Sequence, residues 1–541
     1  MTALSSEKAP QRGADAVIQC LEQHGVKTIY TLSGNHIMPI FDAALGSSIE
    51  LLHVRHEASA VHMADASARL TGRIGVAMVT GGPGHANAVS ALYTAWQSES
   101  PVLLISGHAP THQMGKGAFQ EMDQTTVAAP CAKASLLIRS RDTLRQDLLH
   151  AIAIATSGRQ GPVSVSIAQD ALEALGLDND TAAADHPSTA GATDDAFDTL
   201  ISVLSQSERP MILTGPQLLH PTFRGLARDL ETQCGIPVIG MESPRGMNDP
   251  SLGRFAATAL KADVVVLLGK ALDFTLKFAD ASAFSSQAKF AVVDPDRAAI
   301  DRAHSILGKR LCLSLQCDIP QAIERLRLRY RARSAQHQRW TTQLREEVSA
   351  QPKPHAPTTD GMMHPADALA PFVELARERE MILVCDGGEF GQWAQASIRT
   401  DIRLINGPAG AIGAAIPMAI AAARERPDAL VVAFMGDGAF GFHSSEFDTA
   451  VRYGARFIAV VGNDACWNAE YQIQKRSFGQ ERLIGCELLP IEYQRVAQAY
   501  GADGASCNSP EQVRSAVASA QTSDRAFCIN MFISRTAAPS F

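Results

Sequence analysis

The sequence predicts an α/β protein of three doubly wound domains, each built on a parallel sheet. With 541 residues the chain is too long for a single hydrophobic core, and its length indicates about three domains. Short apolar runs alternate with stretches of helix length, a pattern typical of parallel sheets whose strands are joined by helices. Two polar stretches without apolar periodicity, 178–193 and 351–359, are expected to be linkers. The expected domains are therefore 1–177, 194–333 and 360–541.

The expected elements follow this division in order. The first domain begins with a helix over 14–25, and its apolar runs predict strands at 28–32, 76–80, 102–106 and 163–167. The second domain is expected to contain strands at 211–214, 237–240, 264–268 and 290–293. The third is expected to contain strands at 381–385, 429–435, 457–461 and 528–532. We expect the first and third domains to have related folds, although no internal repeat is readable between them.

The composition narrows the class of protein. Hydrophobic residues make up 46% of the chain and charged residues 19%, which are ordinary values for a globular protein. The net charge of −8 argues against a nucleic-acid partner, because no basic surface is available to neutralise phosphates. The ten cysteines occur singly, without zinc-ligand spacing, so we expect free thiols. No apolar run is long enough to span a bilayer, and residues 1–12 lack an apolar signal core, so we expect a cytoplasmic protein without a membrane partner.

Two strand ends in the third domain carry carboxylates. The run over 429–435 leads into Gly436-Asp437-Gly438, and after a helix-length interval the next run leads into Asn463-Asp464. The carboxyl ends of parallel strands are where ligands bind in an open α/β sheet, and glycines let the backbone approach phosphate oxygens. Mg²⁺ prefers oxygen ligands and commonly joins carboxylates to a diphosphate. The alternative is a tight turn followed by a helix cap.

Further motifs extend this pattern over the whole chain. They are 54–72, which contains His56-Glu57-Ala58, and the stretches Ser33-Gly34-Asn35-His36, Gly81-Gly82-Pro83-Gly84-His85-Ala86-Asn87, Ala118-Phe119-Gln120-Glu121 and Gly407-Pro408-Ala409-Gly410-Ala411-Ile412-Gly413. Together with the two strand ends they make the chain resemble thiamine diphosphate enzymes of the acetolactate synthase, benzaldehyde lyase and 2-hydroxyacyl-CoA lyase group. The resemblance implies pyrimidine-binding, central and diphosphate-binding domains in that order, with thiamine diphosphate and Mg²⁺ as cofactors.

The resemblance also implies a set of cofactor ligands. The metal ligands would be Asp437, Asp464 and the backbone carbonyl of Cys466. The family usually has Asn at the second of these positions, and the extra charge of Asp464 is expected to strengthen metal dependence. The other cofactor contacts would be Gly388, Glu389, Ala411, Ile412, Gly436, Gly438, Ala439, Trp467 and Asn468. Among them, Ile412 would lie under the folded cofactor, although an ordinary buried Ile is the alternative.

Four residues of the first domain are candidates for catalysis. Glu57 matches the carboxylate that hydrogen-bonds the aminopyrimidine ring and favours its reactive tautomer, although a first-turn helix acid is the simpler alternative. In the benzaldehyde lyase resemblance, His36 would relay a hydroxyl proton and Gln120 would hold the substrate oxygen. His85 is expected to project towards the same cavity. A satisfied polar residue in a loop is the alternative for His36.

Gln169 and Gly391 replace bulky aromatic residues of benzaldehyde lyase, which predicts a roomier pocket.

The resulting hypothesis is a carbon–carbon lyase or carboligase that acts on 2-hydroxy ketones or 2-hydroxyacyl-CoA thioesters and releases or joins an aldehyde. Acetolactate synthase or 2-oxo acid decarboxylase activity is the main alternative, and a silent, cofactor-stabilised scaffold is a third. The central domain lacks the flavin-binding stretch of acetolactate synthases and a nicotinamide-binding glycine motif. Coenzyme A phosphates could meet Lys270, Lys277 or Arg302, which are equally compatible with ordinary surface residues. The family resemblance implies a homodimer or homotetramer with active sites at the dimer interface.

Overall fold

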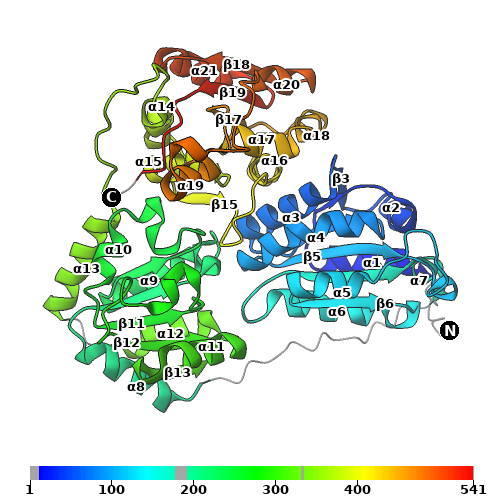
Figure 1. Ribbon diagram of the computed structural model, residues 1–541. Helices are drawn as coiled ribbons and strands as arrows, with labels where there is room; N and C mark the ends of the chain where they lie inside the picture. Colours follow the sequence, from blue (N-terminus) through cyan, green and yellow to red (C-terminus); the bar gives the residue numbers. More distant parts are fainter. Residues whose placement is uncertain (1–10, 177–191, 331–333, 540) are drawn as a thin grey trace. The chain divides into compact units, whose positions relative to one another are not determined.

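The computed structural model describes residues 11–176, 192–330, 334–539 and 541, and the chain falls into two compact units (Figure 1). The first unit, Met1–Ser188, contains one six-stranded sheet, and the second, Thr189–Phe541, contains a five-stranded and a six-stranded sheet. Every pair of neighbouring strands in these three sheets is parallel. The predicted α/β class with three sheet domains is confirmed.

The first sheet has the strand order β3-β2-β4-β5-β7-β6. Its strands are β2 (Thr28–Thr31), β3 (Glu50–His53), β4 (Gly75–Val79), β5 (Val102–His108), β6 (Ala134–Ile138) and β7 (Val163–Ala168). Helices α1 (Gly13–Gln23) and α6 (Arg141–Thr156) bury their apolar side chains against one face of the sheet. Helices α3 (Glu57–Thr71) and α4 (Pro83–Gln97) pack against each other, and α3 also contacts β4. A short antiparallel pair, β1 (Gln11–Arg12) and β8 (Leu175–Gly176), closes the unit.

The central sheet has the order β10-β9-β11-β12-β13 and is buried between two apolar cores. Its strands are β9 (Pro210–Thr214), β10 (Val238–Gly240), β11 (Val264–Leu268), β12 (Lys289–Asp294) and β13 (Leu311–Gln316). Its main helices are α8 (Asp194–Gln206), α9 (Arg224–Cys234), α11 (Arg297–Leu307), α12 (Ile319–Arg329) and α13 (Ala335–Val348).

The predicted end of the central domain at residue 333 is too early. Helix α13 packs onto the central core through Trp340 and Leu344, and the Trp340 indole donates a 2.8 Å hydrogen bond to the carbonyl of Pro210. The expected linker at 351–359 contains no helix or strand, whereas most of the one at 178–193 lies outside the described residues.

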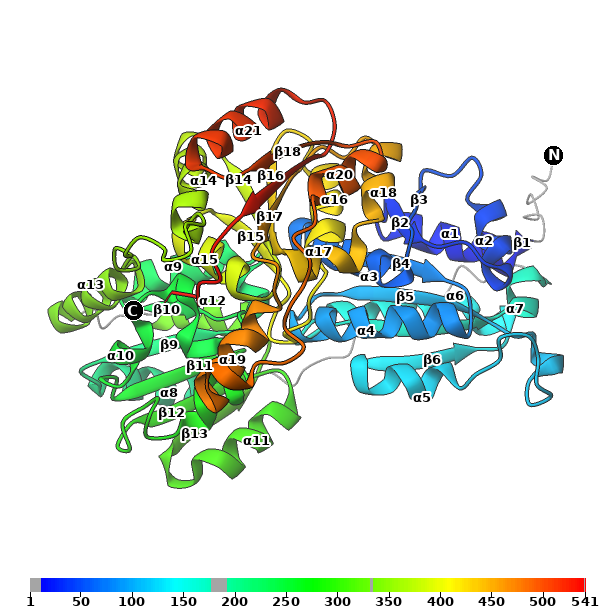
Figure 2. The ribbon, with the colours of Figure 1, turned by 45° about the horizontal axis from the view of Figure 1, so that its top comes forward.

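The third sheet repeats the strand connectivity of the first, with the order β15-β14-β16-β17-β19-β18. Figure 2 labels its strands β14 to β18. Its strands are β14 (Met381–Cys385), β15 (Ile402–Ile405), β16 (Leu430–Gly436), β17 (Ile458–Asn463), β18 (Asp503–Cys507) and β19 (Phe527–Phe532). Its main helices are α14 (Pro365–Glu378), α15 (Glu389–Ser397), α16 (Ala415–Glu425), α17 (Asp437–His443), α19 (Asn468–Phe478) and α21 (Pro510–Thr522). The shared connectivity confirms that the first and third domains have related folds.

Strand direction brings the predicted ligands of the third domain to one edge. Because β14, β16 and β17 are parallel neighbours, their carboxyl ends deliver residues 386–389, 436–438 and 463–466 side by side. Chain order reverses between β14 and β16, and such a reversal opens a crevice in doubly wound sheets. Across the described residues, none of the helices has the length and apolar character needed to cross a bilayer.

Candidate active site

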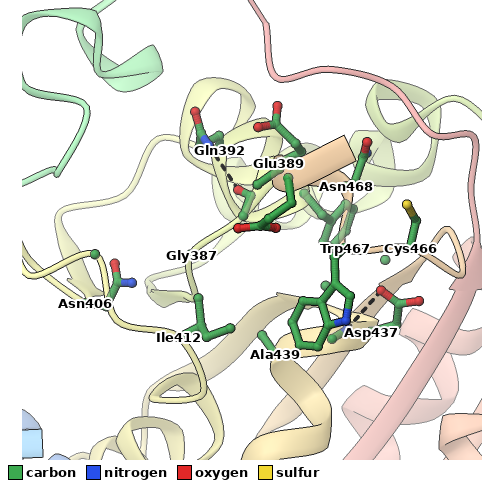
Figure 3. Close-up of a pocket in the computed structure, with 18 of the residues that line it drawn as sticks. Gly387, Glu389, Gln392, Asn406, Ile412, Asp437, Ala439, Cys466, Trp467 and Asn468 are labelled. Carbon is green, nitrogen blue, oxygen red and sulfur yellow. Dashed lines mark hydrogen bonds between the residues drawn. The ribbon is translucent and has the colours of Figure 1, made fainter. Parts of the chain in front are cut away.

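A cavity of about 220 Å³ lies at this edge of the third sheet (Figure 3). Most of the residues that line it come from the ends of β14, β16 and β17 and from the starts of the helices that follow them, and the central domain adds Ser243, Pro244 and Arg245. The lining includes most of the predicted cofactor and metal residues: Gly388, Glu389, Ile412, Gly436, Asp437, Gly438, Ala439, Asp464, Cys466, Trp467 and Asn468. The predicted residue that is not part of this lining is Ala411, whose carbonyl accepts a hydrogen bond from the Asn406 amide.

Asp437 is the first residue of α17 and is almost completely buried. Its Oδ1 accepts a 2.9 Å hydrogen bond from the amide of Gly438, while its Oδ2 is buried without a hydrogen-bond partner among the described residues. Burial raises the pKa of Asp437 to about 6, and the backbone amides of Gly438 and Cys466 act in the opposite direction. A buried carboxylate oxygen without a partner is costly, so a bound cation would satisfy it.

Asp464 follows β17 and lines the same cavity. Burial, and then the nearby charge of Asp437, raise the pKa of Asp464 to about 8, which shows that the two carboxylates repel each other. The next residue, Ala465, has a φ of +52°, an unusual left-handed conformation for a residue with a Cβ. This conformation is part of the turn that leads the chain from Asp464 to Cys466.

Glycines in the walls of the cavity let a ligand approach the protein backbone closely. An added Cβ at Gly388, whose φ is +90°, or at Gly436 would meet no atom within 4 Å, so both positions face open space. Two helices start at the cavity, α15 with Gly388 as its N-cap and α19 with Trp467 as its N-cap. Helix starts present free backbone amides and favour anions.

Two close contacts fix the side walls. A Cβ on Gly438 would lie 2.4 Å from the Trp467 ring, so glycine is required for the indole to pack there. On the other side, a Cβ on Gly387 would lie 2.8 Å from Ile412, whose side chain is held in the cavity wall.

Asp386 is a supporting residue that directly follows β14. Its carboxylate accepts hydrogen bonds from the amides of Gly387 at 2.8 Å, Gly413 at 2.9 Å and Ala415 at 3.0 Å. These bonds fasten the loop that carries Ile412 to the end of β14. No pattern in the sequence separates Asp386 from an ordinary turn residue.

Glu389 is held by two groups that lie far away in the sequence. Arg245 of the central domain donates to its Oε1 at 3.1 Å, and the amide of Ala538 donates to its Oε2. The Gln392 side chain donates to the carbonyl of Gly388 at 3.2 Å (Figure 3). Neither Arg245 nor Ala538 belongs to a recognisable motif, so both were missed.

These features fit a diphosphate with a divalent cation. The open glycine positions and the helix starts suit phosphate oxygens, and the unpartnered Oδ2 of Asp437 beside Asp464 suits the cation. Within the described parts of the chain, no three His, Cys, Asp or Glu side chains converge into a metal site of their own. Mg²⁺ does not need three such side chains, because it is usually bound by one or two carboxylates, phosphate oxygens and water.

In the first unit, Glu57 is the first residue of α3 and is largely buried. Its Oε2 accepts a 3.0 Å hydrogen bond from the Asn87 side chain on α4. Asn87 belongs to the motif over 81–87, but no pattern in the sequence connects it with Glu57. The structure is thus compatible with both interpretations of Glu57, a helix-start acid and a catalytic carboxylate.

Thr80, which follows β4, is the point where the candidates of the first unit meet. Its hydroxyl lies 3.2 Å from His36 Nδ1 and 3.5 Å from Gln120 Oε1. A Cβ on Gly84 would lie 2.8 Å from the Thr80 methyl and 3.4 Å from Glu57 Oε1, so Glu57 is close to the same point. Burial, and then the nearby charge of His108, lower the pKa of His36, which favours the neutral imidazole.

The predicted orientation of His85 is wrong. Its side chain is fully buried, with Nδ1 2.8 Å from the Ser106 hydroxyl and Nε2 3.0 Å from the carbonyl of Gln124. Burial lowers the pKa of His85 to about 4, so the ring is neutral at pH 7. Because both nitrogens are used inside the core, His85 supports the loop around Gln124 and does not project towards a cavity.

Two other expectations need correction. A Cβ on Gly391 would lie 2.1 Å from the carbonyl oxygen of Asp386, so this glycine is required by helix packing and does not widen a pocket. The side-chain amide of Gln169 donates a 2.9 Å hydrogen bond to the carboxylate of Glu173.

Lys270 is buried and donates to Thr275 at 2.8 Å, so its ammonium group points into its own loop and is not placed to meet a nucleotide phosphate.

Comparisons with known proteins agree with this geometry. Three models of the thiamine pyrophosphate enzyme family match the chain: the N-terminal TPP binding domain at 11–127, the central domain at 197–326 and the C-terminal TPP binding domain at 386–531. The chain is 33% identical to 2-hydroxyacyl-CoA lyase 2 of Bos taurus, over 91% of this chain and 85% of that protein. It is 32% identical to the Homo sapiens 2-hydroxyacyl-CoA lyase 2, over 98% and 91%. It is 29% identical to the acetolactate synthase large subunit IlvG of Mycobacterium tuberculosis, over 98% and 97%.

Proposed function

The chain belongs to the thiamine pyrophosphate enzyme family, and from this premise we propose that it is a carbon–carbon lyase or carboligase that uses thiamine diphosphate with Mg²⁺. It would cleave 2-hydroxy ketones or 2-hydroxyacyl-CoA thioesters with release of an aldehyde. In the reverse direction it would form these compounds by joining an aldehyde to a second substrate. The observation that carries this proposal is the meeting of Glu57, His36 and Gln120 around Thr80. Support also comes from relatives named 2-hydroxyacyl-CoA lyase 2.

The third domain would hold the phosphate end of the cofactor. Backbone amides at Gly388 and Gly438 would meet the diphosphate, while Asp437, Asp464 and the carbonyl of Cys466 would hold Mg²⁺. When bound, thiamine diphosphate supplies the carbon centre that attacks a carbonyl and accepts the electron pair of the breaking carbon–carbon bond. Because burial and the nearby charge of Asp437 raise the pKa of Asp464, a bound cation would be needed to keep both carboxylates ionised beside a diphosphate.

Glu57 would hold a proton on the pyrimidine end of the cofactor. The Asn87 amide donates to Glu57 Oε2, and Oε1 would be the oxygen that faces the cofactor. A carboxylate fixed in this way can stabilise one tautomer of an aminopyrimidine ring, which is the role that general acid–base chemistry requires of it.

His36 and Gln120 would act on the substrate. In the cleavage direction the bond between the carbonyl carbon and the carbinol carbon breaks, the carbinol hydroxyl gives up its proton, and the carbonyl carbon gains one. A neutral imidazole at His36 can accept the hydroxyl proton, and the Gln120 amide can donate to the substrate oxygen. In the joining direction the same imidazole returns the proton to the new hydroxyl.

The second candidate is an acetolactate synthase or 2-oxo acid decarboxylase activity. It is favoured by the similarity to the Mycobacterium tuberculosis acetolactate synthase subunit over nearly the full length of both chains. Carbon dioxide leaves a 2-oxo acid without loss of a hydroxyl proton, so this activity would not need His36.

We also propose a homodimer or homotetramer located in the cytoplasm. A complete site would combine the Glu57-bearing unit of one chain with the Asp437-bearing unit of another. Exposed apolar side chains around α19, including Ile473, Phe478 and Ile484, are suited to such an interface.

The deciding experiment is an assay of the purified protein with a panel of aldehydes, 2-oxo acids and 2-hydroxyacyl-CoA thioesters, in the presence of thiamine diphosphate and Mg²⁺. We expect aldehyde release from 2-hydroxyacyl substrates or carboligation of aldehydes. Glu57→Gln should bind the cofactor and lose most turnover, because its amide cannot take the place of the carboxyl proton. Acetolactate formation from pyruvate as the dominant reaction would favour the second candidate. Near wild-type turnover by Glu57→Gln would overturn the assignment of Glu57.

A further inference from the structure

Arg535, in the segment that follows β19, binds the loop that carries Asp464. Its Nε donates to the backbone carbonyl of Asp464 at 2.9 Å, and its Nη2 donates to the carbonyl of Ala465 at 3.1 Å. The same guanidinium group pairs with both carboxylate oxygens of Glu487, at 2.8 and 2.7 Å. A planar guanidinium group with several N–H donors suits such a set of acceptors, which one ammonium group cannot match.

The loop that Arg535 holds has an unusual shape. Ala465 is in the left-handed region, and such a conformation persists where the surrounding structure holds it. The segment that contains Glu487 also braces the loop, because the amide of Leu488 donates to the carbonyl of Ala465 and that of Trp467 to the carbonyl of Cys486. Arg535 therefore ties together the loop over 464–466, the segment over 486–488 and the C-terminal segment.

Arg535 acts from outside the cofactor cavity. It does not belong to that lining within the described residues, and instead lines a neighbouring cavity of about 330 Å³ that also contacts Asp464 and Ala465. Beyond Arg535 the chain continues along the site: the carbonyl of Thr536 accepts from the Asn468 side chain at 3.2 Å, and the amide of Ala538 donates to Glu389. The C-terminal segment thus contacts two of the residues that line the site.

We propose that Arg535 is a positioning residue for the divalent cation. It fixes the two carbonyls that lie between the Asp464 side chain and the Cys466 carbonyl, and so holds these two ligands at the spacing that a small, octahedral cation demands. Its positive charge also lies beside the loop that carries Asp464. The inference rests on the proposed Mg²⁺ site, and it predicts an effect on metal affinity with little effect on the chemical step.

The test compares three full-length variants: Arg535→Gln, Arg535→Lys and the control Arg514→Gln. Arg514 forms a similar bidentate pair with Glu374 on the exposed surface of the same domain, and neither of these two bonds involves a loop carbonyl. Mg²⁺ is titrated at a fixed concentration of thiamine diphosphate, and binding is followed by tryptophan fluorescence because Trp467 lines the cavity. Arg535→Gln should weaken Mg²⁺ binding about 10 to 100-fold, Arg535→Lys less, and Arg514→Gln not at all. At saturating Mg²⁺, kcat should approach the wild-type value.

Several outcomes would overturn the inference. Unchanged Mg²⁺ affinity in Arg535→Gln, with wild-type protein that binds normally, would show that Arg535 does not position the ligands. A loss of kcat that excess Mg²⁺ does not restore would also contradict it. Wild-type protein that binds neither thiamine diphosphate nor Mg²⁺ would instead overturn the proposed function itself. Thermal unfolding without cofactor shows whether Arg535→Gln has a folding defect. If it has, Glu487→Gln replaces it in the test, because this variant leaves the loop contacts of Arg535 in place. Glu487→Gln should weaken Mg²⁺ binding by a smaller factor than that expected for Arg535→Gln.

Discussion

At the scale of single residues, the candidates of the first unit separate into those that lie around Thr80 and one that supports the core. Glu57 and His36 lie near Thr80, and each has one atom engaged with a neighbouring side chain. His85 belongs to the support, because both of its nitrogens are hydrogen-bonded inside the core. The sequence placed all three in motifs of one family, but the motif alone cannot tell which way a side chain points. Hydrogen-bond partners and burial make this distinction.

The role of His36 can be separated from a structural one. If His36 relays a hydroxyl proton, His36→Ala should slow cleavage or ligation by about 10² to 10⁴-fold and affect decarboxylation of a 2-oxo acid far less. Both reactions are measured with the same cofactor-loaded protein. His112→Ala, a mutation of an exposed histidine in the same unit, is the control and should change neither reaction. An equal loss in both reactions would mean that His36 only supports the loop.

The burial of His85 predicts a pH effect on stability. The folded-state pKa of about 4 lies below the ordinary value of 6.5, so the unfolded chain binds a proton that the folded chain does not. The contribution of this group is fully present above pH 6.5 and is lost as the pH falls towards 4, by up to about 3 kcal/mol.

The measurement is thermal or urea unfolding between pH 4 and 7. Since Gln cannot bridge Ser106 and the Gln124 carbonyl in the same way, His85→Gln should be less stable than wild type at pH 7 by about 1–3 kcal/mol. It should also lose less stability on acidification. An unchanged pH dependence in the variant would show that other groups cause the acid effect.

At the scale of elements, most of the fold was predictable because central strands are continuous apolar runs. The strands β4, β5, β11, β14, β16 and β17 all coincide with predicted runs. The strands β3, β6, β15 and β18 lie at sheet edges and were not predicted, since three of them are only partly buried and their sequences are short and mixed. Strand-end motifs pointed to residues that line the cavity of the third sheet. Its supports were not predictable, because Arg245 is 144 residues from Glu389 and Arg535 is 71 residues from Asp464.

The packing of α17 against the loop after β17 gives a prediction about this element. A Cβ on Gly438 would lie 2.4 Å from the Trp467 ring, so Gly438→Ala should displace the indole and cost about 1–3 kcal/mol of stability. We expect a changed tryptophan spectrum without cofactor and weaker cofactor binding. Gly441→Ala is the control on the same helix, because a Cβ there meets no atom within 4 Å. Equal behaviour of the two variants would show that the Trp467 contact is unimportant.

At the scale of the whole molecule, the candidate catalytic and metal residues belong to two compact units. Glu57 belongs to Met1–Ser188, whereas Asp437 and Asp464 belong to Thr189–Phe541. The matching strand connectivity of the first and third sheets shows that one type of fold serves both halves of the proposed site. In each unit the candidate groups follow the carboxyl ends of parallel strands, Glu57 after β3 and Asp437 and Asp464 after β16 and β17.

This division makes the last prediction possible. If a complete site needs the first unit of one chain and the second unit of another, mixing Glu57→Gln with Asp437→Ala protein should restore activity that neither variant has alone. Random exchange in dimers makes half of them hybrids, and each hybrid has one intact site and one doubly altered site, so about a quarter of wild-type activity is expected. Subunit exchange is verified first with two differently tagged wild-type samples. No recovery after verified exchange would show that both units of a site come from the same chain.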